Sequence, residues 1–270
     1  MKHKPLVSIL INNYNKQDYC EKAIRSALYQ SYKKIEIIFY DDFSNDLSLK
    51  RIQNLKIKFK NKLKIIKNKK RTEIFSFNQI NGIVESLEKS KGKIICLMDS
   101  DDFFKKDKVK NVVNFFLMNP KEEILFDLPL IFKNNRIINH RKNDFFIRKN
   151  KWPKFPPTSC ISFKKDSLKK VINKIKIKKF EDLWFDFRIS TCFAINKNQF
   201  NILDKGFTYY RQYEFNYDKK FKKFINIQWW KRRKQAFDYI LFINKKNYQK
   251  NIFSFDYIFT KLINKLFFIY

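Results

Sequence analysis

The first 130 residues alternate short apolar runs with amphipathic segments, and this rhythm limits the possible folds more than any other feature. The apolar runs are 6–12, 35–40, 63–66, 93–98 and 123–132. The segments between them, chiefly 18–28, 47–60, 73–90 and 108–118, place apolar residues at helical spacing. Continuous apolar runs are typical of strands buried on both faces, and strands separated by helices form parallel sheets. We therefore predict an α/β fold with a mostly parallel sheet flanked by helices.

The remainder of the chain is less regular. Residues 151–160 (KWPKFPPTSC) indicate a proline-rich loop, 166–175 and 181–195 indicate helices, and 201–211 indicate an extended segment. From about 221 onward the pattern is helical, aromatic and basic. We predict one domain over 1–215 and a basic, aromatic helical extension over 216–270.

Acidic side chains directly follow two of the predicted strands. The second strand is followed by Asp41-Asp42, and the fourth by Asp99-Ser100-Asp101-Asp102. Open α/β sheets bind ligands beyond the carboxyl ends of their strands, so we expect these carboxylates to share one cleft. A divalent cation that prefers oxygen ligands, Mg²⁺ or Mn²⁺, would relieve their repulsion and in turn bind a diphosphate. The alternative is that DSDD is a solvated turn that caps the next helix.

Two stretches carry a specific resemblance: LVSILINNYNKQDYCEKAIRSALYQSYKKIEIIFYDDFSND near the start, and KGKIICLMDSDDFFKKDKV further on. Both resemble family 2 glycosyltransferases, which have the GT-A fold. The similarity follows the order and spacing of that family through residues 5–118, and more loosely to about 215. It implies an inverting transfer of a sugar from a nucleotide-sugar donor.

The resemblance also implies a donor site. The turn after the first strand would hold the base and ribose, through Asn12, Asn13, Tyr14 and Asn15. Tyr14 would stack on or flank the base, and Asp42 would accept a hydrogen bond from it. The most natural donor of that bond is N3–H of uracil, so a UDP-sugar is favoured. The alternative for Tyr14 and Asn15 is ordinary turn chemistry.

The resemblance also implies that the DSD stretch, 99–101, binds the donor's phosphates through a metal ion. Asp99 would contact the ribose or the metal, Asp101 would coordinate the metal between the two phosphates, and Ser100 lies between them. Relatives often carry an Asn-Gly-Gly-like loop before the helix that precedes this motif. This chain lacks that loop. Arg71 could replace that loop's backbone contacts to phosphate, or simply be exposed.

On the acceptor side, the resemblance implies a general base at the start of the predicted helix 181–195. Asp182 is the first candidate, Glu181 the second, and Asp186 a third by position only. The alternative role for Asp182 is a helix cap. The stretch PPTSCISFKKDSL also resembles the family, which implies that Thr158 and Ser159 line the acceptor pocket; the alternative is an ordinary loop.

One departure lies in GFTYYRQYEFN, which resembles a Tyr-Arg-x-His-x-x-Asn pattern of the family. Position 213 is Tyr where His is usual, which removes a group that could help to bind metal or diphosphate. Arg211 is still able to reach the phosphates. A catalytically weak or inactive homologue is therefore an alternative.

The charge of the chain indicates anionic partners without identifying one. Lysine and arginine number 59 against 26 acidic residues, a net charge of +33. Codon bias explains much of this equally well, because Lys, Asn, Ile and Phe are enriched together. A nucleic-acid-binding protein is the second hypothesis, but no binding motif is present and the carboxylate cluster would repel phosphate. A nucleotidyltransferase is disfavoured by Asp41-Asp42 and by the lack of a glycine-rich phosphate loop.

The C-terminal extension suits a membrane surface. Trp229-Trp230 adjoin the basic run 231–234, and the last segment repeats apolar residues at helical spacing beside Lys261 and Lys265. Packing on the domain or on a partner subunit is the alternative. No uncharged stretch is long enough to span a bilayer, and the dispersed cysteines indicate reduced thiols. We expect a cytoplasmic protein, peripheral on the inner face of the membrane, that acts on a glycan or lipid-linked acceptor.

Overall fold

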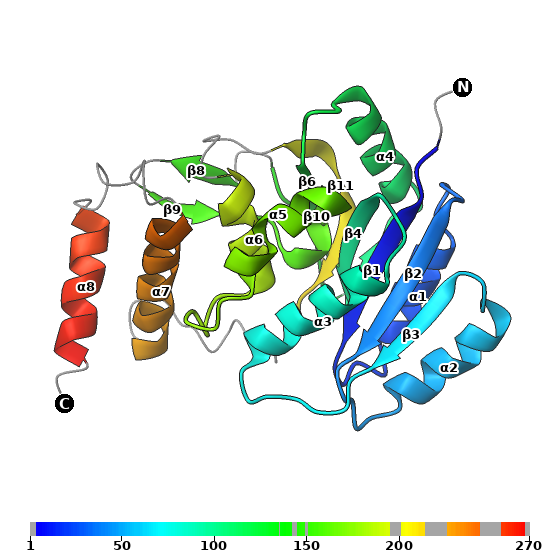
Figure 1. Cartoon of the computed structure of the whole chain (residues 1–270), viewed down its shortest axis with the longest axis horizontal. Helices are drawn as coiled ribbons and strands as arrows, with labels where there is room; N and C mark the ends of the chain where they lie inside the picture. The colour runs from blue at the N-terminus through cyan, green and yellow to red at the C-terminus, as the bar shows by residue number, and fades with distance from the viewer. Residues whose placement is uncertain are drawn as a thin grey trace.

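The computed structural model describes residues 4–134, 136–141, 145–148, 151–194, 201–213, 226–243 and 255–267. Its main sheet has the strand order β3-β2-β1-β4-β10-β6-β11-β5, with β7 paired to β6. Helices cover both faces of this sheet, and the last two helices extend away from one side of it (Figure 1). The predicted α/β architecture with a helical C-terminal extension is confirmed.

The first half of the sheet is parallel, as predicted. It consists of β1 (Val7–Asn13), β2 (Ile35–Asp41), β3 (Leu63–Lys67) and β4 (Ile94–Asp99). The central strand β1 pairs with both β2 and β4, which places Asn12 opposite Asp99 and Asn13 opposite Asp41. The polar residues that follow these strands therefore meet at one edge of the sheet.

Two buried clusters hold the helices against this half. On one face, α1 (Cys20–Leu28), α2 (Ser48–Lys58) and α4 (Lys108–Met118) pack on side chains such as Ile9 and Ile37. On the other, α3 (Phe75–Lys89), α5 (Lys165–Ile175) and α6 (Phe185–Ala194) pack on side chains such as Leu10 and Ile38. Because β1 is buried on both faces, its sequence is a continuous apolar run rather than an alternating one.

The second half of the sheet is mixed. The strand β10 (Ile161–Lys164) lies antiparallel between β4 and β6 (Ile124–Lys133), and β11 (Ile202–Arg211) lies parallel to β6. The short β5 (Phe103–Phe104) pairs with β11, and the hairpin at Asn134 joins β6 to β7 (Arg136–Asn139). A separate pair, β8 (Phe146–Arg148) and β9 (Lys151–Lys154), forms where part of a loop was predicted.

The helix α7 (Ile227–Ile243) packs on the domain rather than standing apart from it. Its Tyr239 is fully buried in a cluster with Phe180 and Leu183. Trp230 is 5% exposed and packs against Phe259 of the next helix, so the prediction that both tryptophans face a membrane is wrong for Trp230.

The last helix, α8 (Phe255–Phe267), packs on α7 with its polar side inward. Tyr257, Thr260 and Asn264 are buried, and the Asn264 amide donates a hydrogen bond of 3.0 Å to the Trp230 carbonyl. Its large apolar side chains are instead exposed: Phe255, Ile258, Phe259, Leu262, Leu266 and Phe267. Among the helices that the structure describes, none combines the length and hydropathy that a bilayer span requires.

Candidate active site

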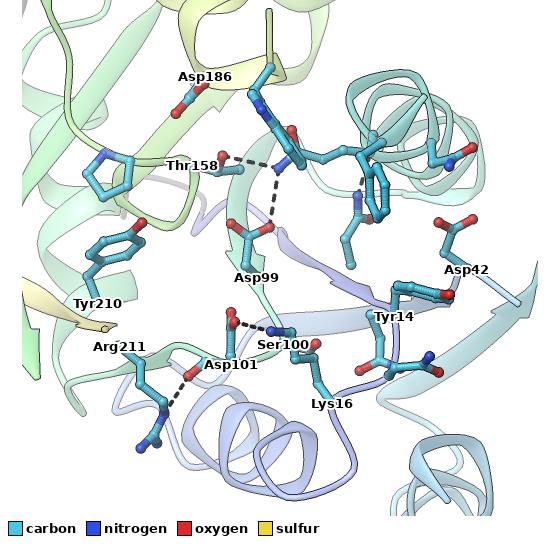
Figure 2. A pocket seen from close by; sticks show the side chains of 18 of the residues that line it. Tyr14, Lys16, Asp42, Asp99, Ser100, Asp101, Thr158, Asp186, Tyr210 and Arg211 are labelled. Carbon is cyan, nitrogen blue, oxygen red and sulfur yellow. Dashed lines mark hydrogen bonds and ion pairs between the residues drawn. The ribbon is translucent and has the colours of Figure 1, made fainter. Parts of the chain in front are cut away.

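A pocket of about 460 Å³ opens at the carboxyl ends of β1, β2 and β4. It contains most of the residues that the sequence singles out: Asn12, Asn13, Tyr14, Asn15, Asp42, Arg71, Asp99, Ser100, Asp101 and Thr158. Figure 2 shows Asp99 and Asp101 in the middle of this group, Tyr14 and Asp42 on one side and Asp186 on the other. Chain segments far apart in sequence thus converge on one cavity.

Asp42, at one end of the pocket, is a nearly buried carboxylate. It forms an ion pair of 2.7 Å with Arg71 and accepts a hydrogen bond of 2.8 Å from Asn68. Burial raises the pKa of Asp42, and both partners oppose that shift. The Arg71 guanidinium also lies 3.2 Å from the centre of the Tyr14 ring. Arg71 is therefore a wall of the pocket, not a surface side chain.

The turn after β1 is fixed by side-chain hydrogen bonds. The Asn13 amide donates to Asp41 (2.9 Å) and Ser44 (3.1 Å), and the Asn15 side chain accepts from the backbone of Asn45 (2.9 Å). Asn15 has a φ of 51°, a left-handed conformation that asparagine tolerates better than most residues. These two asparagines shape the pocket, and the turn chemistry considered from the sequence is present.

Asp99 lies in an acidic environment. Burial raises the pKa of Asp99 to about 7, the carboxylates of Asp101 and Asp186 add to the shift, and Gln79 and Lys16 oppose it. The Gln79 side chain donates a long hydrogen bond of 3.4 Å to the Asp99 carboxylate. The carboxylate repulsion expected from the sequence is thus present, and nearby protein cations offset it only in part.

Asp101 is already held by two donors. Lys16 forms an ion pair of 2.9 Å with its carboxylate, and the Tyr213 hydroxyl donates a hydrogen bond of 2.8 Å to the same oxygen. The Lys16 ammonium also lies 4.5 Å from the centre of the Tyr213 ring. Tyr213, which stands where the family resemblance implies His, therefore contacts the DSD stretch.

The chemistry of these residues fits Mg²⁺ or Mn²⁺. Asp99 and Asp101 offer hard carboxylate oxygens, and the raised pKa of Asp99 reflects first its burial and then the charges of Asp101 and Asp186, a repulsion that a cation would relieve. In the described part of the chain, no three acidic, histidine or cysteine side chains form a complete ligand set. This is the usual situation for Mg²⁺, which takes one or two carboxylates and completes its shell with substrate phosphates and water. Lys16 would compete with the cation for Asp101.

Ser159 does not line the pocket, contrary to the prediction. Its side chain is fully buried, and its hydroxyl donates to Asp102 (2.5 Å) while accepting from the Asp99 backbone (2.9 Å). The other oxygen of Asp102 accepts from the Arg211 backbone at 2.8 Å. Asp102 and Ser159 therefore join three segments: the DSD stretch, the turn at Ser159 and β11. Their polar groups bond to one another because buried polar groups need hydrogen-bond partners.

A buried ion pair lies directly beneath this junction. Lys108, at the start of α4, is fully buried and sits 2.7 Å from Asp127 of β6. Its ammonium also donates to the Ser159 carbonyl and to the Thr208 hydroxyl, both at 2.6 Å. Burial raises the pKa of Asp127, and Lys108 opposes that shift. One ammonium thus ties α4, β6, β11 and the Ser159 turn together.

The first two candidates for the general base, Asp182 and Glu181, lie outside the pocket. The helix α6 begins at Phe185 rather than at 181, so Glu181 and Asp182 belong to the turn before it. Glu181 is exposed, and Asp182 exchanges two hydrogen bonds of 2.9 Å with the Gln235 side chain of α7. Neither residue lines the pocket, whereas Asp186, in the first turn of α6, does.

The late start of α6 has a clear cause in Arg188. This buried guanidinium donates to the backbone carbonyls of Ile175 (2.6 Å), Ile177 (2.6 Å), Phe180 and Leu183 (2.8 Å). These bonds hold the segment before α6 in a wrapped, non-helical path around the helix start. Side-chain hydrogen bonds to backbone carbonyls compete with the bonds of a regular helix. The wrapped segment carries Asp182 away from the pocket and leaves Asp186 facing it.

Gln79 and Lys16 are pocket residues that the sequence did not reveal. Gln79 donates to Asp99 and Thr158 (3.3 Å) and accepts from the backbone of Phe185 at 3.2 Å, so it links α3 to the start of α6. Gln79 looks like an ordinary helix residue, and Lys16 is one of many lysines. No sequence signal separates either from its surroundings.

Comparison with known proteins agrees with this geometry. Residues 8–201 match the model of the glycosyl transferase family 2. A protein of Nostoc sp., described as an uncharacterised glycosyltransferase, is 28% identical over 220 residues, which cover 76% of this chain and 64% of that protein. The Escherichia coli UDP-Glc:α-D-GlcNAc-diphosphoundecaprenol β-1,3-glucosyltransferase WfaP is 35% identical over 114 residues, 41% of each protein. The chain spans less than two thirds of the length of these relatives.

Solved structures show the same fold at low sequence identity. The S. aureus TarS 1-349 complex with UDP-GlcNAc superposes with a TM-score of 0.64 at 18% identity, covering 87% of this chain and 66% of that one. The Pyrobaculum calidifontis mannosyltransferase PcManGT, in complex with GDP-Man and Mn²⁺, gives 0.62 at 14% identity, covering 98% and 72%. Fold, pocket and family match agree, and the chain belongs to glycosyl transferase family 2 with the GT-A fold.

Proposed function

We propose that this protein is an inverting glycosyltransferase that moves a sugar from a nucleotide-diphosphate donor to a glycan or lipid-linked acceptor. The observation that carries the proposal is the convergence of Asp42, Asp99, Asp101 and Asp186 on one pocket. WfaP, whose name specifies a UDP-glucose donor and a lipid diphosphate acceptor, supports this substrate class. Another relative, TuaG of Bacillus subtilis, is described as a putative teichuronic acid biosynthesis glycosyltransferase, which supports a role in making cell-envelope polysaccharide.

The donor would lie along the pocket from Asp42 to Asp101. Asp42 accepts a hydrogen bond from the base, most naturally N3–H of uracil, and Tyr14 and Arg71 flank the ring. Asp99 and Asp101 would hold a divalent cation, which would neutralise charge on the diphosphate when bound. Lys16 and Arg211 add protein cations beside the same phosphates, since both line the pocket.

In the transfer, Asp186 takes the proton of the acceptor hydroxyl. The acceptor oxygen forms a bond to the sugar's anomeric carbon as the bond from that carbon to the diphosphate breaks, and the nucleoside diphosphate leaves with the electron pair. Attack opposite the leaving group inverts the anomeric centre. Asp186 lies in the first turn of α6, where the helix dipole attracts negative charge. Tyr213 retains contact with Asp101, which favours an active enzyme over a degenerate one.

The donor proposal is tested by thermal unfolding with UDP, GDP and CDP, each with and without Mn²⁺. Ligand at about 100 times its Kd stabilises by about 2.7 kcal/mol, so UDP with Mn²⁺ should raise the Tm by several degrees. Because the pKa of Asp99 is about 7, protons compete with the cation below that pH, and the Mn²⁺-dependent shift should be larger at pH 8 than at pH 6. Asp99→Asn should remove that pH dependence. Stabilisation by oligonucleotides alone would instead support nucleic-acid binding.

We further propose that α8 rests on the anionic inner face of the cytoplasmic membrane. Its outer side carries Leu262 and Leu266, more than half exposed, and Lys261 and Lys265 lie on the same helix. An amphipathic helix of this kind binds where apolar side chains enter the lipid boundary and cations meet acidic headgroups. The net charge of +33 acts in the same direction.

For this surface we expect binding to vesicles of acidic phospholipid that weakens with salt. Leu266→Asp should reduce the bound fraction in a flotation assay on the order of tenfold, because it places a charge in the apolar contact. Ile57→Asp on α2 is the matched control, since Ile57 is also a highly exposed apolar residue. Equal binding to neutral vesicles at high salt, or an equal effect of the control, would contradict the proposal.

A further inference from the structure

A second hollow, of about 260 Å³, adjoins the donor pocket on the acceptor side. Asp186 and Arg232 line both cavities, so the two meet at the proposed base. The wall of the second hollow that faces the sheet comes from α6, through Phe187, and the opposite wall from α7, through Trp229 and Arg232. Any acceptor hydroxyl that reaches Asp186 from this side passes Arg232.

The lining of this hollow is cationic and aromatic. Lys154, Arg232 and Arg233 oppose the single carboxylate of Asp186, and the rings of Phe155 and Phe187 lie beside them. Arg233 is engaged elsewhere: it pairs with Asp256 of α8, and its guanidinium lies 5.0 Å from the centre of the Trp229 ring. Of these three cations, Arg232 is the one that lines both cavities, so it is the cation that an acceptor meets where the two cavities join.

The position of α7 beside the base is built into the fold. Gln235 makes two hydrogen bonds to Asp182, just before α6. One turn further along α7, Tyr239 is buried and lies 3.5 Å from the sulfur of Cys192 in α6. These contacts fix the helix that carries Arg232 against the helix that carries Asp186. The C-terminal extension therefore completes the site.

We propose that this hollow binds a phosphate ester of the acceptor, the group that joins its glycan to a lipid carrier, with Arg232 as the residue that recognises it. Arginine suits this role because its planar fork of N–H donors matches phosphate oxygens. The aromatic rings beside it suit the first sugar, whose hydroxyl then points to Asp186. The inference rests on the proposed function and deepens it by assigning the anionic group of the acceptor to a residue outside the matched family region, which ends at 201.

The test measures equilibrium binding of decyl phosphate and of decanol to the full chain with the donor pocket saturated by UDP and Mn²⁺. We expect the wild-type protein to bind decyl phosphate at least tenfold more tightly than decanol. Arg232→Gln should abolish that preference and leave decanol binding unchanged. Lys231→Gln is the control, because the adjacent Lys231 lines a different groove, between α7 and α8.

Four results would overturn the inference. The wild-type protein binding both probes equally would show that no phosphate site exists. Retention of the preference in Arg232→Gln, or its loss in Lys231→Gln, would place the phosphate elsewhere. Loss of UDP affinity in Arg232→Gln would assign this arginine to the donor. Failure of the proposed function is a separate result, because it appears as the absence of UDP binding by the wild-type protein.

Discussion

Replacing Asp186 with Asn should lower kcat by about two to four orders of magnitude, the usual contribution of a general base. The amide keeps the size and most hydrogen bonds of the carboxylate, but it cannot take the proton of the acceptor hydroxyl. UDP binding should persist, since the proposed contacts to the nucleobase and to the phosphates come from other residues. The assay is UDP release from UDP-glucose with a GlcNAc-diphosphate-lipid acceptor, the substrates in the name of WfaP.

Asp182→Asn is the matched control, and the comparison decides between the two candidate bases. The resemblance to the family implies Asp182, whereas the structure turns this carboxylate toward Gln235 of α7. Asp182→Asn should therefore reduce kcat far less than Asp186→Asn does. If the ranking is reversed, Asp182 is the base and the start of α6 must rearrange when substrate binds.

Replacing Lys108 with Met should destabilise the protein by about 3–5 kcal/mol, because it leaves Asp127 buried without its cation. The same change removes donors from the Ser159 carbonyl and from Thr208. The free energy of unfolding is measured by urea denaturation. The UDP affinity of the folded variant should also fall, since Ser159 positions the Asp99 backbone.

Two further variants separate charge burial from loss of helix packing. Lys110→Met, on the exposed side of the same helix, should change the free energy of unfolding by less than about 0.5 kcal/mol. The double variant Lys108→Met with Asp127→Asn should be more stable than Lys108→Met alone, because the orphaned charge is gone. A loss below about 1 kcal/mol in Lys108→Met would show that the ion pair is not what holds this junction.

The parallel half of the sheet, β1 to β4, and the proposed donor site at its edge could be predicted from the sequence because their signals are local. Parallel strands such as β1 and β4 are apolar runs, and the residue after each strand necessarily lies at the same sheet edge. That geometry places Asp42, Asp99 and Asp101 in one pocket whatever the details of packing.

The rest of the molecule, which includes the proposed acceptor side, could not be predicted in the same way, because long-range contacts determine its structure. The start of α6 depends on four carbonyl bonds from Arg188, and the role of Ser159 depends on Asp102 and β11. β10 lies antiparallel between β4 and β6, although its sequence does not show which strands it joins. Helical periodicity predicted α8, but it could not show that Tyr257, Thr260 and Asn264 are the side chains that α8 buries, while its apolar side faces outward.

The order of the last three helices sets the distance that the acceptor must span. α6, α7 and α8 follow one another outward from the sheet, with α7 between the other two (Figure 1). With the outer side of α8 on the bilayer, the reacting hydroxyl must cross the width of two helices, each about 10 Å across, to reach Asp186. Because the proposed phosphate site at Arg232 adjoins Asp186, the lipid carrier itself must rise out of the headgroup region over that distance, and its flexible chain rather than its glycan would span the gap.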